Sequence, residues 1–494
     1  MRTAPNSLNI AAAAAAAALL LAAGCTRAPA SDDLVVPEHY EFQSRFVDGS
    51  GVEHGEATAH HVLIKDIVDL VGSLDHLVDA KTPPFDDGAS AGEVSALLRP
   101  LLDREGSVLA AAKIALTTTP RAVQKTYGDL AGSARSLMTM LQPRPDADAR
   151  LAETWPAAAA AIGTNGAQIT SVAALVDALV NALDANVAAR DSRASPAEPA
   201  VALPSYISDS GVDLHALLAS LLVGAVAYGE AAVNLLAGEA SCADQKGICA
   251  DNSAALAGDG RYTQLEHNWD AAFGYFGAAA RFGVLARTAL RFGPTFADQS
   301  ADGAIDLLRE YNYTPVVDAV RRDADSESPT QLAADAWLAL RRGRALIVRA
   351  AAQPGAADRD ALRVERDNLL GAWERVIAAT VVHHINGALG ASCPCGDSKF
   401  VYGAPGFNEH AAAWSAAKGY ALALGFSPRA RIGDAKLVEL HRLLGDAPKH
   451  RVPGVSDAEV TRYEQDLRTA RSLLGEAYGF AIENLGDEAG DGGW

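Results

Sequence analysis

Three ionisable residues lie at helical spacing near the middle of the chain. Glu266 and Asp270 are four residues apart, and His267 and Asp270 are three apart. A helix over this stretch would gather their side chains on one side. Trp269 belongs to an aromatic stripe beside them. Two carboxylates and an imidazole in apolar surroundings either bind a metal ion or require cations and hydrogen-bond donors from neighbouring helices.

Several other stretches of helical character could supply the partners of this group. Bundle interiors assemble metal sites from glutamate and histidine on facing helices, and Glu409 stands next to His410. The predicted metal ligands are therefore Glu266, His267, Asp270, Glu409 and His410. The residues predicted to bind a ligand or to complete a polar network are Arg344, Glu374, His383, Trp269 and Trp414.

Three interpretations of this group stay open. The first, which we favour, is a buried network of arginine, histidine and carboxylate, because structural networks use the same residue types. The second is a site for an anion or a metal, with a divalent metal or iron as the candidate cofactor, and the third is a catalytic site. No residue is assigned a catalytic role, and a binding protein is favoured over an enzyme. The sequence has no HExxH zinc motif, no P-loop and no dinucleotide-binding fingerprint.

The first 25 residues have the features of a lipoprotein signal peptide. Arg2 precedes an apolar run from Ile10 to Ala23, which is too short to cross a hydrocarbon core about 30 Å thick. Small residues then lead to Cys25, the predicted lipidation site. Thr26 follows where an aspartate would favour the inner membrane. We therefore expect cleavage after residue 24 and attachment to the outer membrane through acyl chains on Cys25.

The composition indicates which partners this protein has. The 494 residues include 42 Lys and Arg against 61 Asp and Glu, a formal net charge of -19. A field of that sign repels phosphate backbones, so nucleic-acid binding is disfavoured. At 49% hydrophobic and 21% charged residues, the chain is globular rather than disordered or polytopic. The expected partners are a membrane, through the lipid anchor, and metal-uptake or other envelope proteins.

The four cysteines after the signal peptide predict disulfides, because an exported chain with an even number of cysteines generally pairs them. They are Cys242, Cys249, Cys393 and Cys395. The first two flank a short polar loop and could close it. Pairing between the two cysteine loops is the alternative.

Helical patterning and abundant alanine predict an all-α fold. Residues 214–236 are the most apolar stretch of the mature chain, and the polar residues within it favour a buried core helix over a membrane span. The tail is expected to be frayed. The predicted order is a signal peptide (1–24), a tether and lead-in segment (25–50), an N-terminal helical bundle (51–191), a linker or crossover (192–204), a C-terminal helical bundle (205–485) and an acidic, glycine-rich tail (486–494).

The stretch Tyr262–Gly277, with the sequence YTQLEHNWDAAFGYFG, resembles the most recognisable motif of an uncharacterised family of bacterial lipoproteins. Other pieces agree in order, among them Tyr40–Phe42, Gly343–Ala345 and Asn408–His410. That family is similar to the imelysins. The resemblance implies two packed helical bundles, export from the cytoplasm, and a role in metal binding or iron acquisition.

These observations together predict an outer-membrane-anchored accessory lipoprotein that binds a ligand or a metal and is linked to iron acquisition. A metal-dependent hydrolase that uses Glu266, His267 or His410 is the alternative from another class. A purely structural surface lipoprotein is the third.

Overall fold

The computed structural model describes residues 34–141, 146–164, 166–238, 242–258, 260–284, 295–352, 358–392 and 403–494. Residues Val36–Trp494 form one compact unit, and the fold below is that of this unit. The predicted signal peptide, the lipidation site Cys25, and Cys393 and Cys395 lie outside the described residues.

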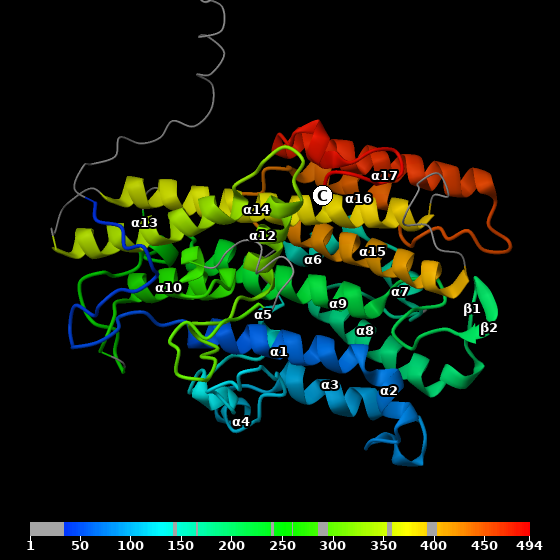
Figure 1. The fold of residues 1–494 in the computed structure, drawn as a ribbon, viewed down its shortest axis with the longest axis horizontal. Helices are drawn as coiled ribbons and strands as arrows, with labels where there is room; N and C mark the ends of the chain where they lie inside the picture. Colours follow the sequence, from blue (N-terminus) through cyan, green and yellow to red (C-terminus); the bar gives the residue numbers. More distant parts are fainter. Residues whose placement is uncertain are drawn as a thin grey trace, which may run out of the picture. The chain divides into compact units, whose positions relative to one another are not determined.

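Helices dominate the described residues, which confirms the predicted all-α fold (Figure 1). The first half contains α1 (Gly55–Gly72), α2 (Leu74–Asp79), α3 (Glu93–Asp103), α4 (Gly106–Ala110), α5 (Leu137–Met140), α6 (Ala147–Thr154), α7 (Ala158–Ile162) and α8 (Val172–Ala188). The second half contains α9 (Leu214–Leu222), α10 (Gln264–Phe276), α12 (Thr314–Asp325), α13 (Leu332–Ala352), α14 (Asp358–Ser392), α15 (Gly403–Leu424), α16 (Asp434–Leu444) and α17 (Asp457–Tyr478).

The long helices pack side by side in successive layers. Helix α14 contacts α13 on one side and α15 on the other, and α15 in turn packs on α9. Helix α1 packs against both α9 and α10, and α17 covers α14 and α16. Figure 1 shows this succession from the red C-terminal helices, through yellow and green, to the blue α1.

The predicted linker at residues 192–204 contains the short hairpin β1 (Ala194–Ser195) and β2 (Glu198–Ala202), whose strands pair antiparallel. Helices on either side of the linker in sequence contact each other, as α1 does with α10 and α6 with α16. The linker therefore lies within one compact unit. The independent folding of the two predicted bundles stays a prediction.

The most apolar stretch is a core helix, as its polar residues predicted. Residues Leu214–Leu235 are the one described helix that is long and apolar enough to cross a membrane, but 83% of its most apolar window is buried inside the protein. The helix continues past α9 as π-helical turns at Val223–Gly229 and Ala231–Leu235. Glycines permit its close contact with α15, because a side chain at Gly224 would strike Ala423 and one at Gly419 would strike Ser220.

The C-terminal tail is ordered, so the prediction of a frayed tail is wrong. Trp494 is only 4% exposed and packs edge-on against Phe480. Its indole Nε1 donates to the Arg322 carbonyl at 2.7 Å, and the Asn386 amide donates to the Trp494 carbonyl at 2.8 Å. Burial of the indole and these hydrogen bonds together oppose the entropy lost when the glycine-rich segment is ordered.

Candidate functional site

The residues predicted to do chemistry start at the first turn of α10. Thr263 is the N-cap: its hydroxyl accepts from the Glu266 N–H, and the Glu266 carboxylate accepts from the Thr263 N–H at 2.9 Å. This capping box fixes Glu266 at the helix start. Asp270 follows one turn later on the same side and is fully buried.

Arg344 of α13 joins these two carboxylates, as predicted. Its Nη1 lies 3.0 Å from Glu266 Oε1 and its Nε 2.9 Å from Asp270 Oδ1, with no exposed surface on the arginine. Arg45 adds a second guanidinium at 3.0 Å from Glu266, and the Tyr40 hydroxyl donates to Asp270 at 2.8 Å. We call these five residues the Arg344 cluster.

Burial and the neighbouring charges shift the pKa values of the Arg344 cluster in different directions. Burial raises the pKa of Asp270 to about 6, and the attraction of Arg344 opposes that rise. Burial also acts to raise the pKa of Glu266, but Arg344 and Arg45 outweigh it and lower the pKa. For Arg344 itself, Asp270 and Glu266 outweigh burial and raise the pKa. Cations and donors thus already hold both carboxylates, which is the arrangement of a structural network.

His267 does not join the Arg344 cluster, so its predicted convergence is wrong. Its ring stacks on Tyr262, and its Nδ1 lies 3.3 Å from Glu53 Oε2. Burial acts to lower the pKa of His267, but the Glu53 carboxylate outweighs it and raises the pKa. One residue along a helix turns a side chain by about 100°, which directs His267 away from Arg344.

Glu409 and His410 are also not brought to the Arg344 cluster. His410 of α15 exchanges a 2.9 Å hydrogen bond with the Tyr463 hydroxyl of α17 and packs against the ring of His450. Among the described residues, no three His, Cys, Asp or Glu side chains gather closely enough to hold a metal ion. The five predicted metal ligands therefore do not form one site.

The other predicted network residues are anchors within the core. Glu374 of α14 is 2% exposed and accepts from the Tyr478 hydroxyl and the Arg431 N–H, each at 2.7 Å. The ring of His383 packs against that of its neighbour His384. The indoles of Trp269 and Trp414 each donate to a backbone carbonyl at 2.8 Å, those of Leu340 and Leu444 respectively.

One predicted disulfide is confirmed. Cys242 and Cys249 are bonded to each other, with their Cα atoms 5.2 Å apart, and close the polar loop between them. This selects the local pairing for these two cysteines over pairing between the two loops. The pairing of Cys393 and Cys395, which lie outside the described residues, stays a prediction.

A cleft of about 420 Å³ opens between α1, α9, α12, α14 and α15, and we call it the α1–α12 cleft. Its apolar surface comes from Ile64, Val68, Ala216, Ala219, Val223, Val317 and Ala416. Its polar and aromatic surface includes His61, Lys65, Asp69, Tyr311, Tyr313, Asp318, Arg321, His384 and Tyr420. An apolar cavity with a few convergent polar groups is the usual form of a small-molecule site.

Polar contacts fix the walls of the α1–α12 cleft. The Tyr420 hydroxyl donates to Asp318 Oδ2 at 2.6 Å, and the His384 ring stacks on Tyr420 with a centroid distance of 5.8 Å. Burial, assisted by the charge of Arg322, lowers the pKa of His384 to about 3, so this imidazole is neutral at physiological pH. Its ring nitrogens have no hydrogen bond to other described residues.

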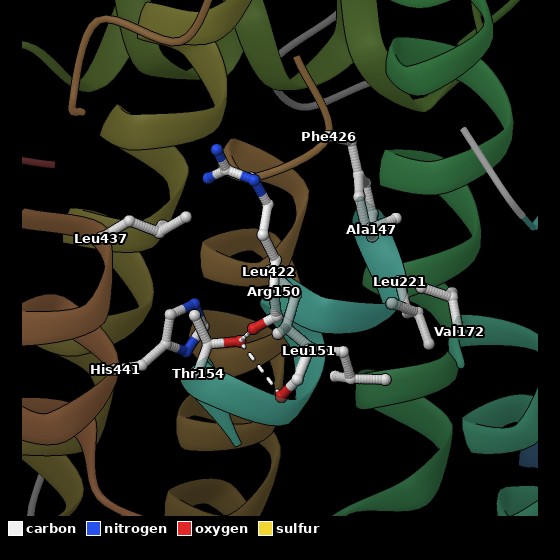
Figure 2. Close-up of a pocket in the computed structure, with 11 residues that line it drawn as sticks. Ala147, Arg150, Leu151, Thr154, Val172, Leu221, Leu422, Phe426, Leu437 and His441 are labelled. Atoms are coloured by element: carbon white, nitrogen blue, oxygen red, sulfur yellow. Dashed lines mark hydrogen bonds between the residues drawn. The ribbon is translucent and has the colours of Figure 1, made fainter. Parts of the chain in front are cut away.

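Sequence reasoning missed the α1–α12 cleft because its residues come from five helices and one loop without a shared motif. The tyrosine pair at 311 and 313 and the histidine pair at 383 and 384 were the available signals. A second recess, shown in Figure 2, lies among Leu151, Leu221, Leu437 and His441. Its volume of about 10 Å³ is barely enough for a single water, so it is not a ligand site.

The loop from Asp298 to Glu310 carries a signal that sequence reasoning also missed. Its order, Asp298-x-Ser300-x-Asp302-Gly303 followed by Glu310, resembles that of calcium-binding loops. It departs from that pattern by a serine at the third position and by a glutamate one residue later than usual. As in such loops, the chain turns through a positive φ at Gly303 (+83°).

Backbone N–H groups order the acidic side chains of this loop. Asp298 accepts from Gly303 N at 2.9 Å, which lowers the pKa of its carboxyl, and Asp302 accepts from Ala304 N at 2.9 Å. The buried Glu310 accepts from Gln299 N and Ser300 N at 2.9 and 2.7 Å. These hydrogen bonds therefore hold the loop in a tight turn.

Comparison with known protein families gives one match, which covers part of the chain. A family model described as a domain of unknown function (DUF4856) matches residues 152–365. The matched region contains the stretch Tyr262–Gly277, Arg344, and the α12 side of the α1–α12 cleft. No curated protein and no solved structure matches the chain. The comparison therefore supports an uncharacterised domain family and names no activity.

The Arg344 cluster predicts a specific pattern of stability. Arg344→Met leaves Glu266 and Asp270 buried beside an apolar side chain, and we expect it to lower the unfolding free energy by about 3–5 kcal/mol. The double variant Arg344→Met and Asp270→Asn should lose less unfolding free energy than the sum of the two single variants, because the second change removes one uncompensated charge. Urea denaturation measures both quantities.

Arg442→Met is the matched control, because Arg442 pairs with Glu439 on the surface of α16 and should lose almost nothing. Equal stability of Arg344→Met and Arg442→Met, or simple additivity in the double variant, would contradict a buried ionic network.

Proposed function

We propose that this protein is a lipid-anchored binding protein of the outer membrane whose helical body takes up a small ligand in the α1–α12 cleft. The observation that carries the proposal is the cleft itself: about 420 Å³, with an apolar surface and polar groups on opposing helices. The anchor is inferred from the sequence that leads to Cys25. In this role the protein acts as an accessory component beside other envelope proteins.

The contrast with the Arg344 cluster supports the choice of the cleft. Each carboxylate of that cluster pairs with a cation through one oxygen, and the oxygen of Asp270 left without a partner, Oδ2, is fully buried, so a ligand would have to open the core to reach it. In the α1–α12 cleft, by contrast, the His384 ring and the exposed Arg321 are available to a ligand.

The alternatives from the sequence find less support. Metal-dependent hydrolysis rested on Glu266, His267 or His410, and these three residues contact different parts of the protein. The link to iron acquisition rested on the family resemblance. A link to iron acquisition therefore needs an iron-bearing organic ligand rather than a metal held by these side chains. A purely structural role does not account for the α1–α12 cleft.

The anchor is tested by Cys25→Ser. Acylation requires the thiol, so this variant should be released into the soluble fraction after cell breakage, whereas the parent protein sediments with the outer membrane. Immunoblotting of fractionated cells measures the distribution. Sedimentation of the variant with the outer membrane would refute a lipid anchor at this residue.

The cleft is tested by filling it. Ala219 contributes a small, partly exposed side chain to the cleft surface, so Ala219→Trp should occupy much of the space without burying a polar group. Small molecules released by denaturing the purified parent protein should be missing from this variant when both are compared by mass spectrometry. Identical extracts from both proteins would count against the cleft as the binding site.

The residue order of the loop Asp298–Glu310 favours a second candidate function, the binding of a hard divalent cation such as Ca²⁺. Oxygen ligands at alternate positions before a glycine are what such a loop requires. Binding would draw on Asp298 and Asp302, whose carboxylates must turn from backbone N–H groups toward the ion, and on Ser300, whose hydroxyl now donates to Asp298. This site would be structural, since it lies outside the α1–α12 cleft.

Calcium should then raise the midpoint of thermal unfolding at millimolar concentration, by an amount that grows with RT ln(1 + [L]/Kd). The double change Asp298→Asn and Asp302→Asn should abolish the shift, while Asp191→Asn, at a fully exposed position elsewhere, should retain it. No shift in the parent protein, or an equal shift in the double variant, would reject the cation site.

A further inference from the structure

We infer that the ligand of the α1–α12 cleft is a small organic anion, with its acidic group held by Arg321 at the rim and its apolar body on the alanine-rich surface of α9. This inference rests on the proposed binding function and adds the chemical class of the ligand.

One cation at the rim forms no ion pair with another described residue. Arg321 of α12 is exposed, and its guanidinium makes no hydrogen bond or ion pair to other described residues. The other cation at the rim, Lys65 of α1, is bound to Asp69 at 3.1 Å. A free guanidinium at the mouth of an apolar cleft is suited to a carboxylate, sulfonate or phosphate, which it can bind through two parallel hydrogen bonds.

A second guanidinium stands behind the same wall. Arg322 is only 4% exposed, its Nη2 donates to Asp325 at 3.0 Å, and its Nε and Nη1 have no hydrogen-bond partner. Its charge reaches His384, one of the cleft residues. Buried and only partly paired, this cation adds a positive potential that water screens little.

The carboxylates of the cleft do not favour a cationic ligand instead. Asp318 accepts a 2.6 Å hydrogen bond from Tyr420, and burial raises the pKa of its carboxyl, which disfavours the charged form. Asp69 is engaged by Lys65 at the outer edge. Among the charged α12 residues that line the cleft, Arg321 is therefore the exposed one that forms no ion pair with another described residue.

The apolar surface determines the rest of the ligand. Ala216 and Ala219 of α9 are partly exposed in the cleft, and their small side chains leave room between α1 and α15. Tyr311 and Tyr313 add aromatic faces on one side. A compact apolar or aromatic body attached to an acidic group fits this combination, and the neutral His384 can donate to it or accept from it.

Two matched fluorescent probes separate the anion from its apolar body. Anilinonaphthalene sulfonate carries a sulfonate, and N-phenylnaphthylamine has the same aromatic body without it. We expect the sulfonate probe to bind the folded parent protein with one site per chain. Arg321→Gln should weaken it about tenfold or more, because a charge-assisted hydrogen bond is lost, and should leave the neutral probe unchanged. Arg321→Lys should restore part of the affinity.

Arg442→Gln, on the surface of α16, is the matched control and should change neither probe. Equal binding of both probes, with no effect of Arg321→Gln on the sulfonate probe, would overturn the anion inference. If Ala219→Trp nevertheless abolished the binding of both probes, the cleft would remain the binding site and only the preference for an anion would fail. If neither Ala219→Trp nor Ala216→Phe weakened either probe while circular dichroism showed folded protein, the proposed binding function itself would fail.

Discussion

The burial of one guanidinium, that of Arg344, constrains much of this structure. A charged group without contact to water loses its hydration, and only close carboxylates and acceptors can make up for that loss. Asp270 and Glu266 meet it from α10, and the Gly51 carbonyl meets it from the lead-in segment. Two parts of the chain that are far apart in sequence, α10 and the segment before α1, therefore have to converge on α13.

The same cluster fixes the lead-in segment before α1. Tyr40 donates to Asp270, and its ring stacks on Phe273 of α10 at a centroid distance of 3.7 Å. Arg45 reaches Glu266 and the carbonyl of Asn252. A segment without regular secondary structure thus becomes part of the core, because its polar side chains complete an ionic network that would otherwise be unsatisfied.

Spacing within one helix could be read from the sequence, but contacts between helices could not. The pair Glu266 and Asp270 and their meeting with Arg344 followed from a four-residue interval and from the need of buried carboxylates for a cation. The prediction for His410 was wrong because the adjacent pair of glutamate and histidine does not reveal which helix it faces. In the structure His410 faces Tyr463. The docking of Trp494 depends on Phe480 and on the Arg322 carbonyl, neither of which local composition reveals.

The Arg344 cluster and the α1–α12 cleft are connected through α10. The helix that carries Glu266 and Asp270 also presents the Tyr275 carbonyl, which is 3.0 Å from His61 Nε2 on α1. At the end of α10, Gly277 accepts from the Tyr313 N–H at 2.8 Å, and Tyr313 stacks on His61. His61 and Tyr313 both line the cleft. The ionic network therefore holds α10, and α10 in turn positions one wall of the cleft. Under the proposed function, the ionic network that the spacing of Glu266 and Asp270 predicted would support the cleft from behind rather than bind the ligand itself.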